Sequence, residues 1–235
     1  MKNREAPAPS QAAEAGKPEG EFGAINLTSL GSRLRAERER LEVSLRELAR
    51  RVEVSPSMIS QIERGLAMPS VSTLWLLATE LGLTIDELFS SSERAGVPTG
   101  GGQEASIVRD GTSPRCPVQR RGDRKRIRLA GDVVWERLTA QPDDEVEFLH
   151  VTYQPGAESC PPDSLFRHGG KEYAYILSGR LGLQIGFESY ELETGDSVSF
   201  SAQMPHRLWA IGGEPATAIW VVINRTGDAR APERG

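Results

Sequence analysis

The pattern of cap and turn residues changes about half way along the chain, and this change limits the possible folds more than any other feature. Residues 28–90 combine apolar residues at helical spacing with repeated helix-capping residues. From about residue 115, short alternating apolar runs are separated by turn pairs such as Pro155-Gly156 and Gly169-Gly170. That texture is typical of a small all-β sandwich or barrel. The sequence therefore predicts an α + β multidomain protein.

The composition around these two parts gives the domain boundaries. Residues 1–27 are rich in Ala, Pro, Glu and Gly without apolar periodicity, so we expect a disordered tail. A helical domain over 28–90 precedes a Gly/Ser-rich linker over 91–114. The β domain spans 115–228, and 229–235 form a C-terminal tail. Because the linker composition is flexible, we expect the two domains to be separate units.

Several classes of protein are excluded by composition. No stretch approaches the ~20 apolar residues of a membrane helix, and the polar first residues lack the apolar core of a secretory signal. Two cysteines, Cys116 and Cys160, are too few for a disulfide framework. We therefore expect a cytoplasmic protein with no membrane partner. The net charge of −5 does not exclude nucleic acid, because phosphate binding depends on where Arg and Lys are placed.

Five short helices are predicted in the N-terminal part from their caps. They are expected at about residues 29–41, 44–52, 55–65, 70–82 and from 84 onward. Ser/Thr-x-x-Glu capping boxes begin the second and the fifth, at Ser44 and Thr84. Ser55 followed by Pro56 is an N-cap with proline at the first helical position, which begins the third. The result is a compact bundle with tight turns.

Only Glu53 and Val54 separate the second helix from the cap of the third. Two helices joined so tightly are typical of a helix-turn-helix DNA reader. The bundle resembles the XRE, or lambda-repressor-like, family over about 60 residues, in the segments Leu45-Arg46-Glu47-Leu48-Ala49, Val54-Ser55, Ile59-Ser60-Gln61-Ile62-Glu63-Arg64-Gly65 and Pro69-Ser70. The resemblance implies that the third helix enters the major groove of double-stranded DNA.

Carried over position by position, the resemblance implies DNA-binding roles for Arg46, Ser55, Pro56, Ser57, Met58 and Gln61. Gln61 can make a bidentate contact with adenine. Many family members have Gln where this chain has Leu45, so Arg46 is the candidate for that phosphate contact. Apolar residues at helical spacing are also expected in the core, above all Ile59 and Ile62. We expect Glu63 to be a structural partner of an arginine, Arg50 or Arg51.

The β half resembles the cupin family, a double-sheet, jelly-roll-like β-barrel, over about 100 residues. The first motif of that family contains two histidines, a glutamate and a glycine. Its second His, the Glu and the Gly fall on His168, Glu172 and Gly179, whereas its first His falls on Phe166. The second motif begins at Gly195-Asp196 and places a ligand on His206. Phe166 is therefore a departure from the family pattern. The second motif departs further at Ser201, Gln203 and Ala210.

His168, Glu172 and His206 offer two imidazoles and one carboxylate. This is the ligand set of a facial triad for Fe(II), and it could also hold another divalent ion such as Mn, Ni or Zn. The alternative is a polar hydrogen-bond network without metal, because Phe166 has replaced one donor. Both interpretations stay open at the level of sequence.

A barrel of this size can enclose one small ligand. The candidates for its pocket are Arg167, Tyr175, Arg207, Trp209 and Trp220, which flank the motif residues. An arginine there favours a carboxylate-bearing metabolite. Outside the pocket, we expect His150 to be an ordinary strand residue and Cys160 a bystander thiol. The basic run at 120–128 could contact DNA, but we expect it to be counter-charge to the acidic barrel or a solvated edge.

The order of the two domains resembles known helix-turn-helix plus cupin regulators over nearly the whole chain. That resemblance implies a sequence-specific DNA-binding transcription regulator, not an enzyme, whose cupin domain senses a small metabolite. It also implies a homodimer through the cupin domains, which would place two readers on a pseudo-palindromic operator. The alternative is a mononuclear non-heme iron enzyme of the phosphonate epoxidase type, whose His, Glu and distant His ligand pattern fits His168, Glu172 and His206.

Overall fold

A computed structural model describes residues 27–89 and 117–224 of the chain. The expectations for the linker over 91–114 and for the C-terminal tail lie outside these residues, as does almost all of the predicted N-terminal tail. The elements run in the order of helices first and strands second, as the change in sequence texture predicted. No helix within the two described ranges is long and apolar enough to cross a membrane.

The helical domain consists of α1 (Leu27–Arg40), α2 (Leu45–Arg51), α3 (Pro56–Glu63), α4 (Val71–Leu81) and α5 (Ile85–Leu88). The caps predicted from the sequence begin these helices. The Ser55 side chain accepts a hydrogen bond from Met58 N, with Pro56 as the first helical residue. A full capping box joins Thr84 and Glu87. At Ser44 only half of the predicted box forms as expected, because the carboxylate of Glu47 accepts from Arg50 and Arg51 instead.

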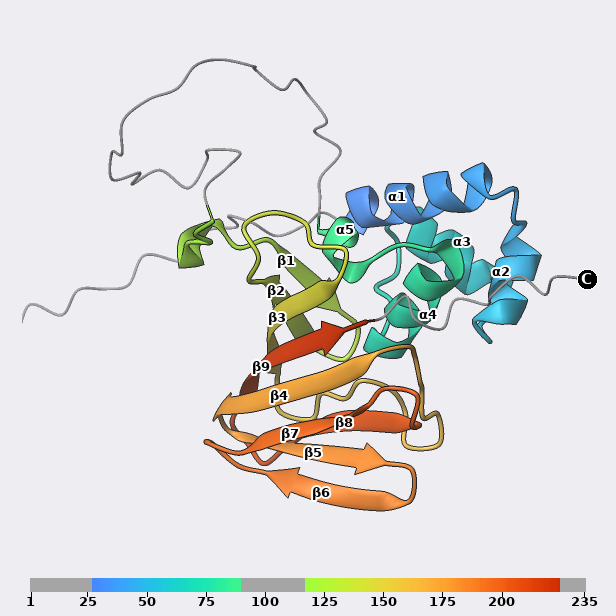
Figure 1. The fold of residues 1–235 in the computed structure, drawn as a ribbon. Helices are drawn as coiled ribbons and strands as arrows, with labels where there is room; N and C mark the ends of the chain where they lie inside the picture. The colour runs from blue at the N-terminus through green and yellow to red at the C-terminus, as the bar shows by residue number, and fades with distance from the viewer. Residues whose placement is uncertain (1–26, 90–116, 225–235) are drawn as a thin grey trace, which may run out of the picture.

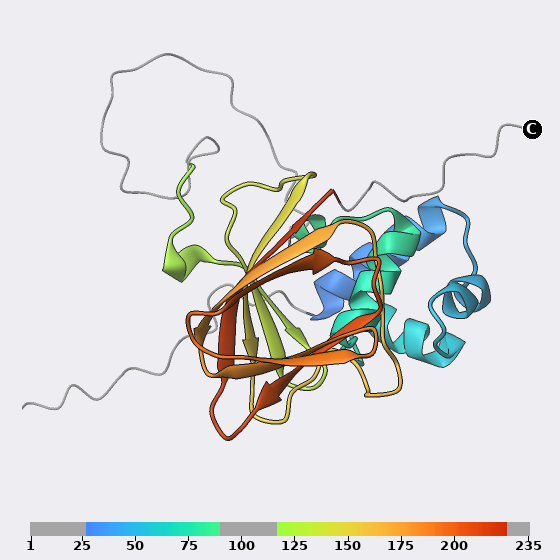
Figure 2. The ribbon, with the colours of Figure 1, turned by 60° about the horizontal axis from the view of Figure 1, so that its bottom comes forward.

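The C-terminal domain is built from a short 3₁₀ helix and nine strands in two antiparallel sheets. The strands are β1 (Arg126–Leu129), β2 (Val133–Arg137), β3 (Val146–Tyr153), β4 (Lys171–Ser178), β5 (Arg180–Ile185), β6 (Glu188–Leu192), β7 (Ser197–Ser201), β8 (His206–Ile211) and β9 (Ala216–Ile223). One sheet has the order β1-β2-β3-β9-β4-β7 and the other the order β6-β5-β8. Figure 2 shows the two sheets curving around a common interior. The predicted double-sheet barrel is confirmed.

Alternation along the strands sorts the side chains between the interior and the outside of the barrel. On β9, Ala216, Ala218, Trp220 and Val222 are buried, while the residues between them are partly exposed. The same period of two applies on β8, where His206, Leu208 and Ala210 are buried. On β8 and β9, every second side chain therefore lines the interior of the barrel.

The two domains pack against each other, so the expectation of separate units is wrong. Figures 1 and 2 show α4 and α5 next to the barrel, with α2 on the far side of the bundle. Backbone bonds join them, from Ser72 N to Ser159 O at 3.2 Å and from Ala130 N to Pro69 O at 2.9 Å. Their buried apolar residues form one continuous cluster. The sequence missed this because linker composition says nothing about surface complementarity.

A buried polar contact closes the same interface beside α5. The carboxylate of Asp86 accepts from Thr139 Oγ1 and from Asp143 N, each at 2.9 Å, and lies 3.5 Å from the guanidinium of Arg137. Burial raises the pKa of Asp86, against the opposing effects of Arg137, Thr139 and the Asp143 amide. Glu147 Oε1 accepts from Ile85 N at 2.7 Å, at the start of α5. The interface thus has both apolar and hydrogen-bonded parts.

Candidate functional site

The first candidate site is the exposed face of α3. Ser55, Pro56, Ser57, Met58 and Gln61 are all exposed, and Met58 reaches 41%. Ile59 and Ile62, on the opposite side of the same helix, are buried at 1% and 2% exposure, as predicted. The predicted DNA contacts therefore share one solvent-facing surface at the beginning of a helix, which is the end that reads base edges in helix-turn-helix proteins.

The position of α3 is fixed by a buried ion pair. Arg38 Nε and Nη2 donate to the two carboxylate oxygens of Glu63 at 2.6 and 2.9 Å. The prediction that Glu63 is a structural partner of an arginine is therefore confirmed, but the partner is Arg38 and not Arg50 or Arg51. Those two arginines pair with Glu47, three and four residues away on their own helix, because that contact needs no tertiary approach. Sequence spacing favours local partners and cannot reveal Arg38, which lies 25 residues before Glu63.

Arg46 is a basic residue near this face that is available for phosphate. It is exposed on α2, and no carboxylate among the described residues lies within ion-pair distance of it. Arg35 and Arg40, on α1, pair with Glu39 and Glu37. An unpaired exposed arginine beside a reading helix is suited to a non-specific backbone contact.

The second candidate site is a cluster of three side chains inside the barrel, here called the His-Glu-His cluster: His168, Glu172 and His206. Glu172 lies on β4, His206 begins β8, and His168 lies in the loop before β4. Glu172 Oε1 is 2.8 Å from His168 Nε2 and 3.2 Å from His206 Nε2. The possible ligand atoms of all three lie within 4.8 Å of one another. The structure thus brings together the three residues predicted as metal ligands.

The hydrogen bonds of the cluster define where its protons can be. His168 Nδ1 is 2.9 Å from Gly169 O, and His206 Nδ1 is 2.8 Å from Met204 O. Because a carbonyl oxygen only accepts, each Nδ1 must carry a hydrogen. In a neutral imidazole, Nε2 then presents a lone pair, and both Nε2 atoms face Glu172 Oε1. Three hydrogen-bond acceptors, the two Nε2 atoms and Glu172 Oε1, therefore converge, and a proton or a metal ion is needed between them.

The charge of Glu172 fits that requirement. Burial opposes ionisation of this side chain, but His168 and His206, when their Nε2 atoms carry protons, outweigh burial and hold the pKa of Glu172 at about 2. Trp220 Nε1 also donates to Glu172 Oε2 at 2.7 Å. The carboxylate is therefore anionic and oriented on both oxygens. Backbone carbonyls that fix the two imidazoles from behind are the usual second partners of metal-ligating histidines.

The cavity around the cluster is small and its walls are mainly apolar. Its volume is about 20 Å³, close to the space of a single water molecule. Besides the cluster, it is lined by Val71, Trp75, Trp135, Leu149, Val151, Tyr153, Phe166, Leu208 and Trp220. Burial raises the pKa of the Tyr153 hydroxyl, with the charge of Glu172 acting in the same direction. The lining contains no lysine or arginine.

Only one of the five predicted pocket residues, Trp220, lines this cavity. Arg207 and Trp209 alternate with the inward residues of β8, and Trp209 packs over Gly182, where the indole leaves no space for a Cβ atom. Arg207 pairs with Glu158 at 3.0 Å. Tyr175 is on the outer face of β4, and Arg167 is exposed. The arginines that suggested a carboxylate-bearing effector therefore lie outside the cavity.

Sequence reasoning missed Val71 and Trp75, which come from α4 of the other domain. Nothing local to these residues signals the contact, because an apolar residue on a helix is expected to face its own bundle. Trp135 and Tyr153 were also missed. For Tyr153 a signal exists: it continues the alternation of Leu149 and Val151 on β3.

The remaining expectations concern residues outside the cavity. His150 lies on β3 with Nδ1 3.6 Å from Glu136, as an ordinary strand residue. Arg124 and Arg126 both pair with Glu136, so this part of the basic run does act as counter-charge. Cys160 is buried, which raises the pKa of its thiol, and it does not line the cavity. These groups take no part in the site.

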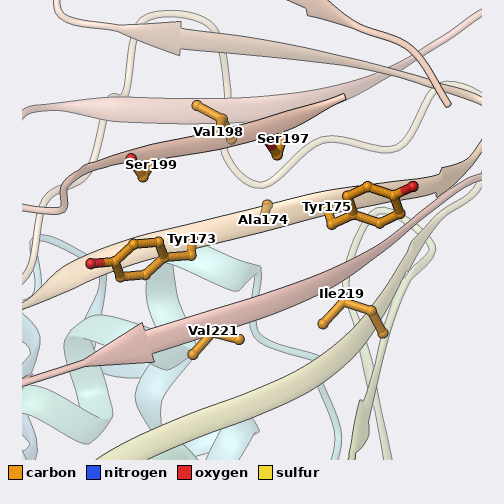
Figure 3. Close-up of a pocket in the computed structure, with 8 residues that line it drawn as sticks. All are labelled: Tyr173, Ala174, Tyr175, Ser197, Val198, Ser199, Ile219 and Val221. Carbon is orange, nitrogen blue, oxygen red and sulfur yellow. The ribbon is translucent and has the colours of Figure 1, made fainter. Parts of the chain in front are cut away.

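The outer face of the larger sheet carries a shallow aromatic patch, here called the outer tyrosine patch. Figure 3 shows Tyr173 and Tyr175 on β4, flanked by Ile219 and Val221 of β9. Serines of β7 border its other side. The hollow has a volume of about 370 Å³. Aromatic residues gathered on an exposed sheet face are typical of protein–protein contact surfaces.

Comparison with protein families defines the class of each domain. Residues 34–88 match the helix-turn-helix family HTH_3, and residues 149–222 match the cupin domain family Cupin_2. The chain therefore consists of an N-terminal helix-turn-helix domain and a C-terminal cupin domain, which confirms both resemblances. This is the domain composition of helix-turn-helix transcriptional regulators with a cupin domain.

Individual relatives agree with this composition. The HTH-type transcriptional regulator PuuR of Escherichia coli is 27% identical over 178 residues, which cover 75% of this chain and 84% of that regulator. An HTH_3 family transcriptional regulator from Vibrio cholerae shares the fold, with a TM-score of 0.58 and 21% identity over 84% of this chain and 96% of its own. Hydroxypropylphosphonic acid epoxidase from S. wedmorenis covers 84% of this chain and 98% of its own at 21% identity, with a TM-score of only 0.38.

Proposed function

We propose that this protein is a sequence-specific DNA-binding transcription regulator whose cupin cavity senses a small molecule and modulates operator binding. The observation that carries DNA binding is the exposed surface of α3, which presents Ser57, Met58 and Gln61 to solvent while Ile59 and Ile62 are buried. Sensing is supported by the His-Glu-His cluster, which is buried, polar and enclosed by the barrel. Because its target is DNA, we place the protein in the cytoplasm.

The proposed reading mode predicts different effects for two variants. Gln61→Ala is expected to weaken specific operator binding by about 1–3 kcal/mol and to relax the preference at one base pair, because it removes a base-edge contact. Arg46→Ala is expected to weaken binding to all sequences and to reduce the salt dependence, because it removes a phosphate contact. Fluorescence anisotropy with operator and unrelated duplexes at several salt concentrations measures both effects.

Arg40→Ala is a matched control for the second variant, because Arg40 is an exposed arginine already paired with Glu37 on α1. It is expected to bind DNA like the wild type. If Gln61→Ala and Arg46→Ala also bind like the wild type, α3 is not the reading helix.

We also propose that two copies pair through the outer tyrosine patch, so that two readers contact the half-sites of a pseudo-palindrome. Tyr175→Asp is expected to shift the full-length protein from dimer to monomer, because it places a carboxylate in the outer tyrosine patch. Sedimentation velocity at micromolar concentration measures this change. Phe187→Asp is the control, since Phe187 is a fully exposed aromatic residue outside the patch. A wild-type protein that sediments as a monomer would rule out pairing.

For the cavity we propose a divalent metal ion held by His168, Glu172 and His206. The convergence of three acceptors supports this assignment, since an ion would satisfy all of them. Such an ion would supply positive charge and open positions for a ligand atom. Backbone carbonyls of Gly169 and Met204 orient the imidazoles, Trp220 orients the carboxylate, and the apolar walls of the cavity exclude water. The arrangement would therefore select a ligand that can donate an electron pair to the ion.

Phe166→His is expected to raise the affinity for Ni²⁺ by about tenfold or more, because it adds a donor at the family's first histidine position. The Phe166 ring lies 4.5 Å from the His206 ring and 5.9 Å from that of His168, centroid to centroid. Titration calorimetry measures the affinity. Binding needs deprotonated imidazoles, so the affinity for the ion is expected to fall at acidic pH. Tyr175→His adds a histidine outside the cavity and should leave the affinity unchanged; equal gains in both variants would contradict the assignment.

An iron enzyme of the phosphonate epoxidase type is the second candidate function. The ligand set of the His-Glu-His cluster is the observation that favours it. One observation weighs against it. No basic residue among the described ones lines the cavity to hold a phosphonate. Oxygen consumption by the iron-loaded protein with a hydroxyalkyl phosphonate would favour the enzyme.

A further inference from the structure

The DNA-reading domain supplies part of the wall of the cupin cavity. Val71 and Trp75, both on α4, line the cavity together with the His-Glu-His cluster. The Trp75 indole lies parallel to the His168 ring, with 4.2 Å between centroids and 3° between planes. On its other side it meets Trp135 edge-on at 6.1 Å. Trp75 is 4% exposed, so a helix of one domain closes the ligand site of the other.

The remaining space decides what the closed cavity can hold. A volume of about 20 Å³ accommodates one water molecule or one ion. A metabolite with a ring or a short carbon chain needs several times that space. Most other walls are strand side chains held in the barrel ladders, whereas Trp75 and Val71 lie on α4, which packs against the barrel from the other domain. Trp75 is the larger of these two side chains, so it is the part of the wall that can move for a larger ligand without breaking a strand ladder.

The contacts of α4 and α5 connect the position of Trp75 to the arrangement of the domains. Ser72 lies one turn before Trp75 and donates its backbone N–H to Ser159 O at 3.2 Å. The Ser159 hydroxyl in turn accepts from Leu208 N, two residues after His206 on β8. Displacement of α4 from the barrel breaks the first of these bonds. Occupancy of the cavity and the position of the reading domain are thus linked through one short path.

We propose that Trp75 is the lid of the sensor site. A small planar ligand that fills the cavity displaces the indole from His168, shifts α4 off the barrel and so moves the DNA-reading domain. The ligand takes the place of the Trp75 indole beside His168. Its class is therefore an aromatic or heteroaromatic ring with an electron-pair donor atom directed at the His-Glu-His cluster. This inference rests on the proposed sensor function and assigns its regulation to one side chain.

Hydrogen exchange of the full-length protein tests the lid. In Trp75→Ala, the backbone amides of Ser72, Ile85 and Ala130, all hydrogen-bonded across the interface, are expected to exchange about tenfold or more faster than in the wild type. Free indole, which matches the deleted side chain, is expected to restore their protection. Trp209→Ala, which removes a tryptophan outside the cavity, is the matched control and should leave these amides unchanged.

A folded Trp75→Ala protein with interface amides as protected as in the wild type would overturn the lid. If Trp75→Ala does not fold, Trp75→Leu keeps an apolar side chain but loses the ring stack, and it is expected to show the same faster exchange. Wild-type protection in a folded Trp75→Leu protein would overturn the lid. A second probe separates the lid from the proposed function. Wild-type protein loaded with Ni²⁺ is expected to lose interface protection when imidazole ligates the ion. Ligation without any change in exchange would overturn the lid and leave the metal site and DNA reading standing.

Discussion

Glu63→Ala is expected to lower the free energy of unfolding of the helix-turn-helix domain by about 3–5 kcal/mol, because it leaves a buried guanidinium without its carboxylate. Arg38 and Glu63 are 8% and 7% exposed, and two hydrogen bonds join them. Arg38 Nη1 also donates to Val43 O at 3.0 Å, so the same guanidinium holds the turn after α1. The total free energy of unfolding of a native protein is only about 5–15 kcal/mol. Urea unfolding followed by helical circular dichroism measures the loss.

Two controls separate the buried pair from charge loss in general. Glu37→Ala removes the partner of Arg40 on the surface of α1 and is expected to lower the free energy of unfolding by at most about 1 kcal/mol. The double variant Arg38→Met with Glu63→Leu replaces both charges by apolar groups and is expected to recover most of the loss. If Glu63→Ala unfolds no more easily than Glu37→Ala, the pair does not hold α3 in place.

Gly31→Ala is expected to destabilise the same domain by about 1–3 kcal/mol or more, although alanine is the better helix former. A Cβ atom at Gly31 would lie 2.6 Å from Glu63 O and nearer still to Ile62 O. Both atoms belong to the backbone of α3, so the helix itself has to move. Because α3 carries Gln61, operator affinity is expected to fall together with the free energy of unfolding.

Gly213→Ala is the matched control, since nothing lies within 4 Å of the added methyl group there. Urea unfolding and anisotropy on both variants measure the two effects. Helix propensity alone would make Gly31→Ala more stable than the wild type by about 1 kcal/mol. That outcome would show that α1 and α3 are not in such close contact.

Local features of this fold could be predicted because they depend on neighbours in the sequence. The Ser55 cap is a bond of 3.1 Å between a side chain and an amide three residues on. Alternation on β8 and β9 likewise needs only the strand itself. If Glu172 and His206 had been used to set the inward phase, the same alternation would have excluded Tyr175, Arg207 and Trp209 from the cavity.

The features that the sequence did not reveal depend on tertiary approach. Glu63 takes Arg38 rather than a nearer arginine, because packing of α1 on α3 decides which guanidinium is buried with it. Trp75 faces the barrel instead of its own bundle because the two domains dock. The His-Glu-His cluster was identified through the cupin motif, since His168 and His206 come together only when the two sheets close.

Selection of DNA from a random pool by the purified full-length protein tests the central claim most directly. For a regulator that reads through paired α3 helices, the enriched sequences should share one pseudo-palindromic motif. Its half-sites should lie about one helical turn, roughly 10 base pairs, apart. The same selection with Gln61→Ala should lose or change the preference at one position in each half-site. A pool that shows no shared motif after selection, or the same motif with Gln61→Ala, would contradict sequence-specific reading by α3.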